Sequence, residues 1–228
     1  MARSPTPSFS YVHVFEPGTV PAAPPLLLLH GTGGNEHDLL RLGRTLSPGS
    51  ALLSPRGDVN EGGALRFFSR IREGVFDPAE ITRRTHALAD FLQAAAGHYR
   101  LDLRRLVAIG FSNGANIAAT VLLLRPECLG DAVLLRPMVV LDRPATAGSL
   151  AGRRVLLCHG STDPLVPPEH RQRLAELFAA GGATISSQVT PASHALTPRD
   201  VAAAQAWLQG ATAAPANPAP GPAPGGGR

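Results

Sequence analysis

Residues 106–124 read LVAIGFSNGANIAATVLLL, and this stretch decides the fold. It begins with an apolar run typical of a buried strand and ends with apolar residues at the spacing of a buried helix. Between the two runs lies the G-x-S-x-G motif Gly110-Phe111-Ser112-Asn113-Gly114. In such a motif the serine sits on a sharp turn, and the glycines are needed because side chains there would collide with the strand and helix. The context predicts Ser112 as a nucleophile, the alternative being a structural strand-to-helix turn.

Outward from this stretch, short apolar runs alternate with longer segments of helical period. Their Val, Leu and Ile content is typical of strands that are buried on both faces, as in a parallel sheet. We therefore expect an α/β fold with a mostly parallel central sheet and helices on both faces. The expected strands are 26–29, 51–53, 106–109, 132–135, 155–158 and 184–189, with an edge strand at 9–15.

Three helix starts are marked by capping residues or proline. Asp77-Pro78-Ala79-Glu80 has the order of a capping box and predicts a helix to about Ala96. Pro167-Pro168 and Thr197-Pro198 are expected to open two further helices, and Asp200 to cap the last one. No element is expected for 56–76, which fits neither period.

The composition favours one globular domain followed by a tail. A chain of 228 residues with 44% hydrophobic content can bury one substantial core, which we assign to residues 1–210. Residues 211–228 are rich in Ala, Pro and Gly, lack large apolar side chains, and are expected to be disordered.

Charge and cysteine usage exclude several classes of protein. The net charge is +4, but every basic side chain is Arg and the arginines are scattered among acidic residues, so nucleic-acid binding is not expected. No signal peptide or membrane-spanning run is found, which predicts a cytoplasmic protein without a membrane span. Cys128 and Cys158 are expected to be buried free thiols, and neither zinc-ligand spacing nor a G-x-G-x-x-G motif occurs.

A nucleophilic serine needs a base, and in a hydrolase of this kind the acid and then the histidine follow it along the chain. His194, in TPASHALTP, comes after the last expected strand and is favoured as the base. The alternatives are His159, which comes straight off a strand, and His170, early in a helix.

Asp163, in CHGSTDPLVP, is the favoured acid, because it follows a strand at the edge where open α/β sheets place their sites. It could instead be only a turn-forming residue before Pro164. The other acidic candidates downstream of Ser112 are Asp131, Asp142 and Asp200.

A glycine-rich turn, His30-Gly31-Thr32-Gly33-Gly34, follows the first buried strand. Such a turn can point a backbone N–H at the developing oxyanion, together with the N–H of the residue after the nucleophile. We assign these donors to Thr32 and Asn113, although the glycines could serve only a tight turn.

The segment 56–76 carries apolar residues and is too short for a helical lid. We expect Phe67, Phe68 and Phe76 to line the substrate pocket and to favour short acyl or aromatic esters. Arg66, with Arg70, is a candidate for binding a carboxylate or phenolate at the rim, the alternative being solvated surface arginines.

With these residues in hand, the chain resembles the phospholipase/carboxylesterase family of bacterial α/β-hydrolases, small relatives of the acyl-protein thioesterases. The resemblance runs from about Val12 to Gly210. It rests on LLLLHGTGGNEHDLL (26–40), RGDVNEGGALRFFSRIREGVFD (56–77), VAIGFSNGANIAATVLL (107–123), HGSTDP (159–164) and SHALT (193–197).

The resemblance implies a cofactor-free serine esterase with the α/β-hydrolase fold, a minimal lid, a small-molecule ester substrate and a possible homodimer. The same residues, Ser112, Asp163, His194, Thr32 and Asn113, then fall on the family's catalytic positions. Two departures are visible. Ser193 stands where Gly usually precedes the histidine, and Arg136-Pro137-Met138 stands where the family tends to have His-Pro-Met, so the pocket wall expected around Met138 can differ.

Acyl-transfer machinery does not itself choose the leaving atom, so a thioesterase or lactone hydrolase with the same triad is an alternative to an esterase. A non-catalytic ligand-binding protein with a hydrolase fold is a more distant one.

Overall fold

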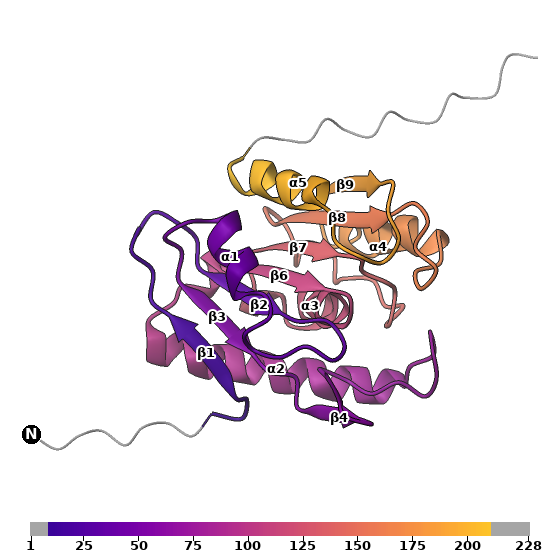
Figure 1. Cartoon of the computed structure of the whole chain (residues 1–228), viewed down its shortest axis with the longest axis horizontal. Helices are drawn as coiled ribbons and strands as arrows, with labels where there is room; N and C mark the ends of the chain where they lie inside the picture. The colour runs from indigo at the N-terminus through magenta and orange to yellow at the C-terminus, as the bar shows by residue number, and fades with distance from the viewer. Residues whose placement is uncertain (1–8, 211–228) are drawn as a thin grey trace, which may run out of the picture.

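The computed structural model describes residues 9–210, so the expected tail lies outside the described residues. Within that range seven strands form one sheet, in the order β1-β3-β2-β6-β7-β8-β9 (Figure 1). All neighbours pair in parallel except β1, which is antiparallel to β3. The strands are β1 (His13–Glu16), β2 (Leu26–Leu29), β3 (Leu52–Pro55), β6 (Val107–Phe111), β7 (Asp131–Leu135), β8 (Arg154–Gly160) and β9 (Thr184–Thr190).

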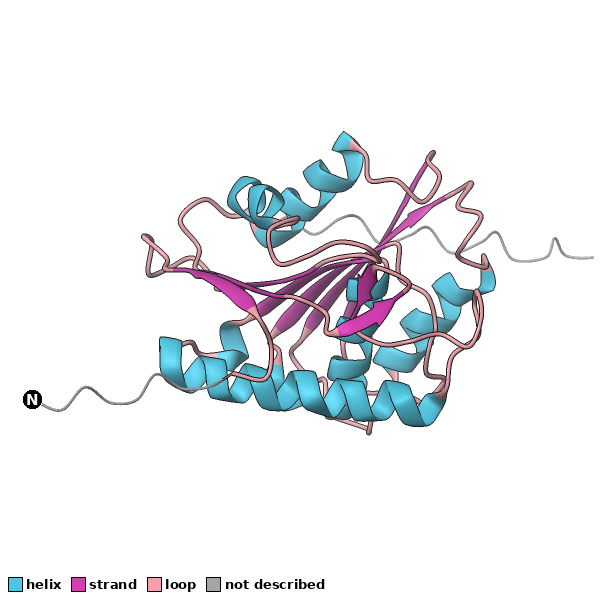
Figure 2. Ribbon diagram, turned by 60° about the horizontal axis from the view of Figure 1, so that its bottom comes forward, coloured by secondary structure: helices cyan, strands magenta, loops and turns pink. Residues whose placement is uncertain are grey.

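Helices cover both faces of the sheet, as Figure 2 shows. One face packs its buried apolar side chains against α2 (Pro78–Tyr99), α3 (Asn113–Leu124) and α4 (Glu169–Ala179). The other face packs against α1 (Leu40–Leu46) and α5 (Pro198–Leu208). Single 3-10 turns lie at η1 (Leu103–Arg105) and η2 (Pro126–Cys128). These layers confirm the predicted α/β-hydrolase architecture.

The central strands are buried because each is nearly continuous in Leu, Val and Ile, which suits a sheet covered on both faces. β9 departs from this expectation. Its sequence, TISSQVT, leaves all its residues but Thr190 exposed or half-buried, because the strand lies at an edge of the sheet. The prediction of burial on both faces is therefore wrong for β9.

One helix and one two-stranded hairpin were not predicted from the sequence. Helix α1 has no side-chain cap and spans seven residues, so its ends carry little signal. It packs closely on the sheet through Gly43, where a Cβ would approach Leu28 Cδ1 to 2.9 Å. The second element is a hairpin of β4 (Val59–Glu61) and β5 (Ala64–Arg66), turned by Gly62 and Gly63, which both have positive φ.

Within the described residues, the cysteines, the helices and the metal-ligating side chains were each compared with the expectations from the sequence. Cys128 and Cys158 are buried and free, as predicted. None of the helices in this part of the chain is both long and apolar enough to cross a membrane. In residues 9–210 no group of three or more His, Cys, Asp or Glu side chains is arranged to hold a metal ion.

Candidate active site

Ser112 occupies the sharp junction between β6 and α3. Its φ of 52° and ψ of −115° lie outside the regions that most residues adopt, and such a conformation costs on the order of 1–3 kcal/mol. The Ser112 N–H donates to the carbonyl of Leu135, at the end of the adjacent strand β7, over 2.9 Å. Tertiary contacts therefore hold the serine in a conformation that the local chain would not choose.

The two glycines of the motif allow the strand and helix to approach this closely. A Cβ on Gly110 would lie 2.6 Å from the Ala115 Cα, and one on Gly114 would lie 2.0 Å from the Leu29 carbonyl oxygen. Both contacts are with backbone, which cannot move aside without displacing an element of the core. The steric reason for the G-x-S-x-G spacing is thus present at both positions.

His194 and Asp163 meet Ser112 at the carboxyl edge of the sheet. The His194 Nε2 is 2.8 Å from the Ser112 Oγ, and its Nδ1 is 2.8 Å from the Asp163 Oδ2. Asp163 follows β8 and His194 follows β9, so parallel strands bring them to the same edge. An imidazole that donates from Nδ1 to a carboxylate can accept the hydroxyl proton at Nε2.

The alternative reading of Asp163 as a turn residue also describes the structure. Its other oxygen, Oδ1, accepts the Leu165 N–H over 2.9 Å. The side chain is 1% exposed, whereas that of His194 is 22% exposed. The turn therefore orients the carboxylate, and the histidine remains accessible from solvent.

The competing histidines lie elsewhere. His159 is buried in β8, and neither of its ring nitrogens has a hydrogen-bond partner among residues 9–210. Burial, with a smaller effect of Arg171, lowers the pKa of His159 to about 4. The His170 Nδ1 accepts the Val139 N–H over 3.2 Å. Neither ring is hydrogen-bonded to the Ser112 Oγ, whereas the His194 Nε2 is.

The competing acids each have an arginine partner. Asp131 pairs with Arg154, Asp142 with Arg173, and Asp200 with Arg136. Of the four acids considered, Asp163 is the one whose carboxylate binds the His194 ring.

The glycine-rich turn after β2 lies beside the first turn of α3. Neither the Thr32 N–H nor the Asn113 N–H has an acceptor among the described residues. The turn is held by the hairpin, because the Gly33 N–H donates to the Leu65 carbonyl over 2.9 Å and the Arg66 Nη1 donates to the Thr32 Oγ1 over 2.8 Å. Free N–H groups at a helix N-terminus attract negative charge, so this corner suits an oxyanion.

His30 supports the same turn and was missed by the sequence analysis. Its Nδ1–H donates to the Gly31 carbonyl over 2.7 Å, and its Nε2 accepts the Gly57 N–H over 2.9 Å. A ring nitrogen that accepts must be unprotonated, and burial lowers the pKa of His30 accordingly. A histidine directly after a buried strand was the available signal, but the sequence does not reveal its backbone partner.

The structure places the three aromatic residues that were expected in the pocket away from it. Phe67 and Phe68 are fully buried in the core, and half-buried Phe76 packs edge-on against Phe68. The Phe67 N–H donates to the Asn113 Oδ1 over 2.8 Å, which anchors this segment over α3. The prediction that these rings line the substrate pocket is wrong, because the hairpin directs the following residues into the core.

Met138 is likewise buried, and its N–H donates to the Asn116 Oδ1 over 2.8 Å. A cavity of about 250 Å³ opens instead at Ser112. It lies among residues from five separate segments of the chain, and none of Met138, Phe67, Phe68 and Phe76 lines it. The lining residues are Thr32, Arg66, Arg70, Glu73, Phe111, Ser112, Leu165 and His194.

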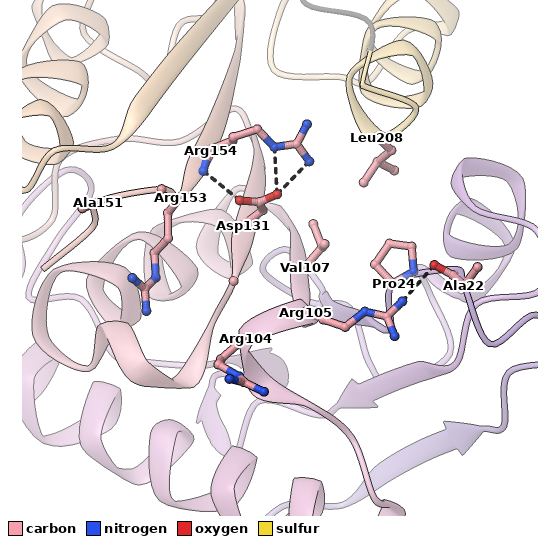
Figure 3. A pocket seen from close by; sticks show the side chains of 12 residues that line it. Ala22, Pro24, Arg104, Arg105, Val107, Asp131, Ala151, Arg153, Arg154 and Leu208 are labelled. Atoms are coloured by element: carbon pink, nitrogen blue, oxygen red, sulfur yellow. Dashed lines mark hydrogen bonds and ion pairs between the residues drawn. The ribbon is translucent and has the colours of Figure 1, made fainter.

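A second cavity, of about 560 Å³, lies at the opposite end of the parallel strands, where these strands begin (Figure 3). Four arginines line it, and each is held by protein groups. Arg154 pairs with Asp131 and Arg104 with Asp102, while Arg105 and Arg153 donate to backbone carbonyls. These side chains fasten loops and strand ends, so we place no site here.

Comparison with known proteins finds matches over most of the chain. The family model described as Phospholipase/Carboxylesterase matches residues 11–211. MhqD of Bacillus subtilis (strain 168), which carries a provisional hydrolase name, is 42% identical over 197 residues, covering 86% of this chain and 97% of MhqD.

Solved structures give the same result. A crystal structure of the Bacillus cereus carboxylesterase is 41% identical, with a TM-score of 0.84, and the match covers 87% of this chain and 93% of that one. A structure of YahD with malic acid is 30% identical, with a TM-score of 0.82, and the match covers 90% of this chain and 100% of that one.

Proposed function

The chain belongs to the phospholipase/carboxylesterase family, and from this premise we propose that it hydrolyses small carboxylic esters with Ser112 as nucleophile, His194 as base and Asp163 as orienting acid. The observation that carries the proposal is the continuous hydrogen-bonded chain from the Ser112 Oγ through the imidazole to the Asp163 carboxylate, at 2.8 Å on each side.

In the proposed reaction, His194 takes the hydroxyl proton at Nε2 as the Ser112 Oγ attacks the ester carbonyl carbon. Asp163 keeps the other ring proton on Nδ1 and stabilises the imidazolium. His194 then gives its proton to the departing alcohol, and an acyl-enzyme forms. Water, deprotonated by the same nitrogen, attacks the acyl carbon. The bond from that carbon to the Ser112 Oγ then breaks, His194 returns the proton to the Oγ, and the carboxylic acid is released.

Thr32 and Asn113 are the proposed oxyanion donors. Their N–H groups have no acceptor in the described part of the chain, and the hairpin fastens the turn through Gly33 and Thr32. Donors held in place before the reaction stabilise the developing charge without reorganisation.

The cavity supports a small substrate. At about 250 Å³ it is below the range of about 300–1,000 Å³ in which drug-sized ligands bind. Short acyl chains or single aryl rings therefore fit better than long acyl chains. Arg66 and Arg70 line the cavity and are paired there with Glu61 and Glu73. We propose that an ester carrying a carboxylate is accepted as well, in competition with these two carboxylates for the arginines. The YahD structure with malic acid, a dicarboxylic acid, motivates this class.

The test is a series of p-nitrophenyl esters from C2 to C16, extended with monoesters of succinate and with thioesters of equal acyl length. We expect kcat/KM to be highest between about C2 and C6 and the succinate monoesters to be hydrolysed, with Ser112→Ala inactive throughout. A preference for palmitoyl-length esters would contradict the proposed substrate size, and faster turnover of thioesters would replace the esterase assignment.

A further inference from the structure

Arg136 lies between the turn that carries Ser112 and the loop that carries His194. It directly follows Leu135, the last residue of β7, whose carbonyl accepts the Ser112 N–H. Its φ of 56° is in the left-handed region, and its side chain is fully buried. A residue without a favourable backbone conformation and with a buried charge must be held by specific partners.

All five N–H donors of the guanidinium have an acceptor. The Nε donates to the Ser193 carbonyl over 3.1 Å, and the Nη2 donates to the Ala195 carbonyl over 2.8 Å. The Nη1 and Nη2 also bind the two oxygens of Asp200, over 3.0 and 2.7 Å. The remaining donor, on Nη1, reaches the Cys158 carbonyl over 3.3 Å.

Asp200 holds the guanidinium in this orientation. Besides Arg136 it accepts hydrogen bonds from the Thr190 hydroxyl and from the N–H and hydroxyl of Thr197. Burial alone would raise the pKa of Asp200, but the bonds from Arg136 and Thr197 outweigh burial and lower that pKa. From the sequence, Asp200 was expected to cap the last helix and was an alternative candidate for the catalytic acid.

We propose that Arg136 is a positioning residue for the catalytic base, because it fixes the backbone on both sides of His194 while the adjacent Leu135 fixes the backbone of Ser112. This inference rests on the proposed function, in which His194 is the base. The acceptors, Ser193 and Ala195, are the two chain neighbours of His194, in a loop without regular structure.

The geometry explains why an arginine is required. A lysine has three donors on one nitrogen, so it cannot bind both carbonyls and both oxygens of Asp200 at once. Without the two carbonyl contacts, the loop retains the bond from the Thr162 N–H to the Ala192 carbonyl, which lies two residues before His194. A shift of about 1 Å in a reacting group costs about 10²-fold in rate.

The test compares Arg136→Met and Arg136→Lys with Arg153→Met. Arg153 is the matched control, because it also donates to three backbone carbonyls, those of Pro126, Leu129 and Ser149, but at the opposite edge of the sheet (Figure 3). For each protein, thermal unfolding, kcat and KM for p-nitrophenyl butyrate, and the rate of Ser112 labelling by a fluorophosphonate are measured at a temperature where that protein is folded.

We expect kcat of Arg136→Met to fall about 10²-fold and that of Arg136→Lys about tenfold, with KM changed less than threefold. The labelling rate should fall in parallel, since labelling also depends on the base. Arg153→Met should lose stability yet keep kcat within twofold. If Arg136→Met does not fold, Arg136→Lys decides.

The proposal is overturned if the folded Arg136 variants keep kcat within threefold of wild type, or if Arg153→Met loses kcat to the same extent. A wild-type protein that a fluorophosphonate does not label would instead contradict the proposed function itself. The labelling arm thus separates failure of the positioning role from failure of the triad.

Discussion

Ser112 combines a strained backbone with a side chain that is within 2.8 Å of an imidazole nitrogen. Strain of this kind persists only where the surrounding structure imposes it, and here Leu135 and the packed glycines do so. Each single side chain of the triad can therefore be tested without disturbing the backbone that carries it.

Ser112→Ala and His194→Ala are each expected to lower kcat by about 10⁴ to 10⁶, because the members of a triad act as a unit. The measurement is steady-state hydrolysis of p-nitrophenyl butyrate, with far-ultraviolet circular dichroism to show that the fold is retained. Activity above about a tenth of wild type in either folded variant would refute the assignment.

Asp163→Asn should lower kcat by about 10³ to 10⁴, since an amide no longer stabilises the tautomer that His194 needs. Asp142→Asn is the control, because Asp142 is exposed and pairs with Arg173 away from the triad. We expect its kcat to stay within twofold of wild type. Equal losses in the two variants would mean that Asp163 is not the acid.

At the scale of elements, the junction of β2, β6 and α3 depends on close backbone approach. Gly114→Ala would put a methyl group 2.0 Å from the Leu29 carbonyl oxygen, so α3 must shift. We expect a loss of about 1–3 kcal/mol in the free energy of unfolding, measured by urea denaturation.

The control for this substitution is Gly97→Ala in α2, where an added Cβ meets no atom within 4 Å. Alanine is the better helix former, so this variant should be up to about 1 kcal/mol more stable than wild type. If Gly114→Ala is as stable as wild type, the close approach does not constrain the fold.

The loop between β2 and α1 is fastened by an ion pair in which Arg56 Nε and Nη2 each lie 2.5 Å from a carboxylate oxygen of buried Glu36. The hydrogen bonds from Arg56 lower the pKa of Glu36 from 4.5 to about 2. A lowered folded-state pKa means that the pair stabilises the protein above pH 4.5. That contribution is lost as the pH falls towards 2.

Solvent around the half-exposed Arg56 screens the pair, so the contribution is smaller than the pKa difference alone implies. Urea denaturation of wild type and Glu36→Gln between pH 7 and pH 3 measures it. We expect the difference between the two proteins to shrink on acidification. A difference that is constant over this range would show that Glu36 is not ionised in the pair.

At the scale of the whole molecule, the described residues 9–210 include the sheet, both helical layers and the candidate site. We propose that this part of the chain is the functional unit. Truncation after Gly210 removes residues that offer no large apolar side chain for packing. The melting temperature should change by less than about 2 °C and kcat by less than twofold. A larger fall in the melting temperature would show that the removed segment contacts the domain.

The sequence by itself determined which segments form the buried central strands and where the G-x-S-x-G turn lies. It also determined that Ser112, Asp163 and His194 should meet at the carboxyl ends of the parallel strands. These features follow from local patterns: apolar runs specify buried strands, glycines specify a tight junction, and parallel strands carry their following loops to one edge. The capped helices starting after Asp77 and Thr197 were predicted for the same reason. The short helix α1 and the exposed strand β9 carried weak local signals and were missed or misjudged.

Only the tertiary structure decided which distant segments meet at the site. Phe67 and Phe68 were expected in the pocket, yet the hairpin β4–β5 directs them into the core and brings Leu65 and Arg66 against the turn at Thr32. Arg136 looked like an altered pocket residue, yet its buried guanidinium fastens the loop of His194. Hydrogen-bond partners of this kind are far apart in sequence and leave no periodic pattern, so burial and contact reveal them, and composition and spacing do not.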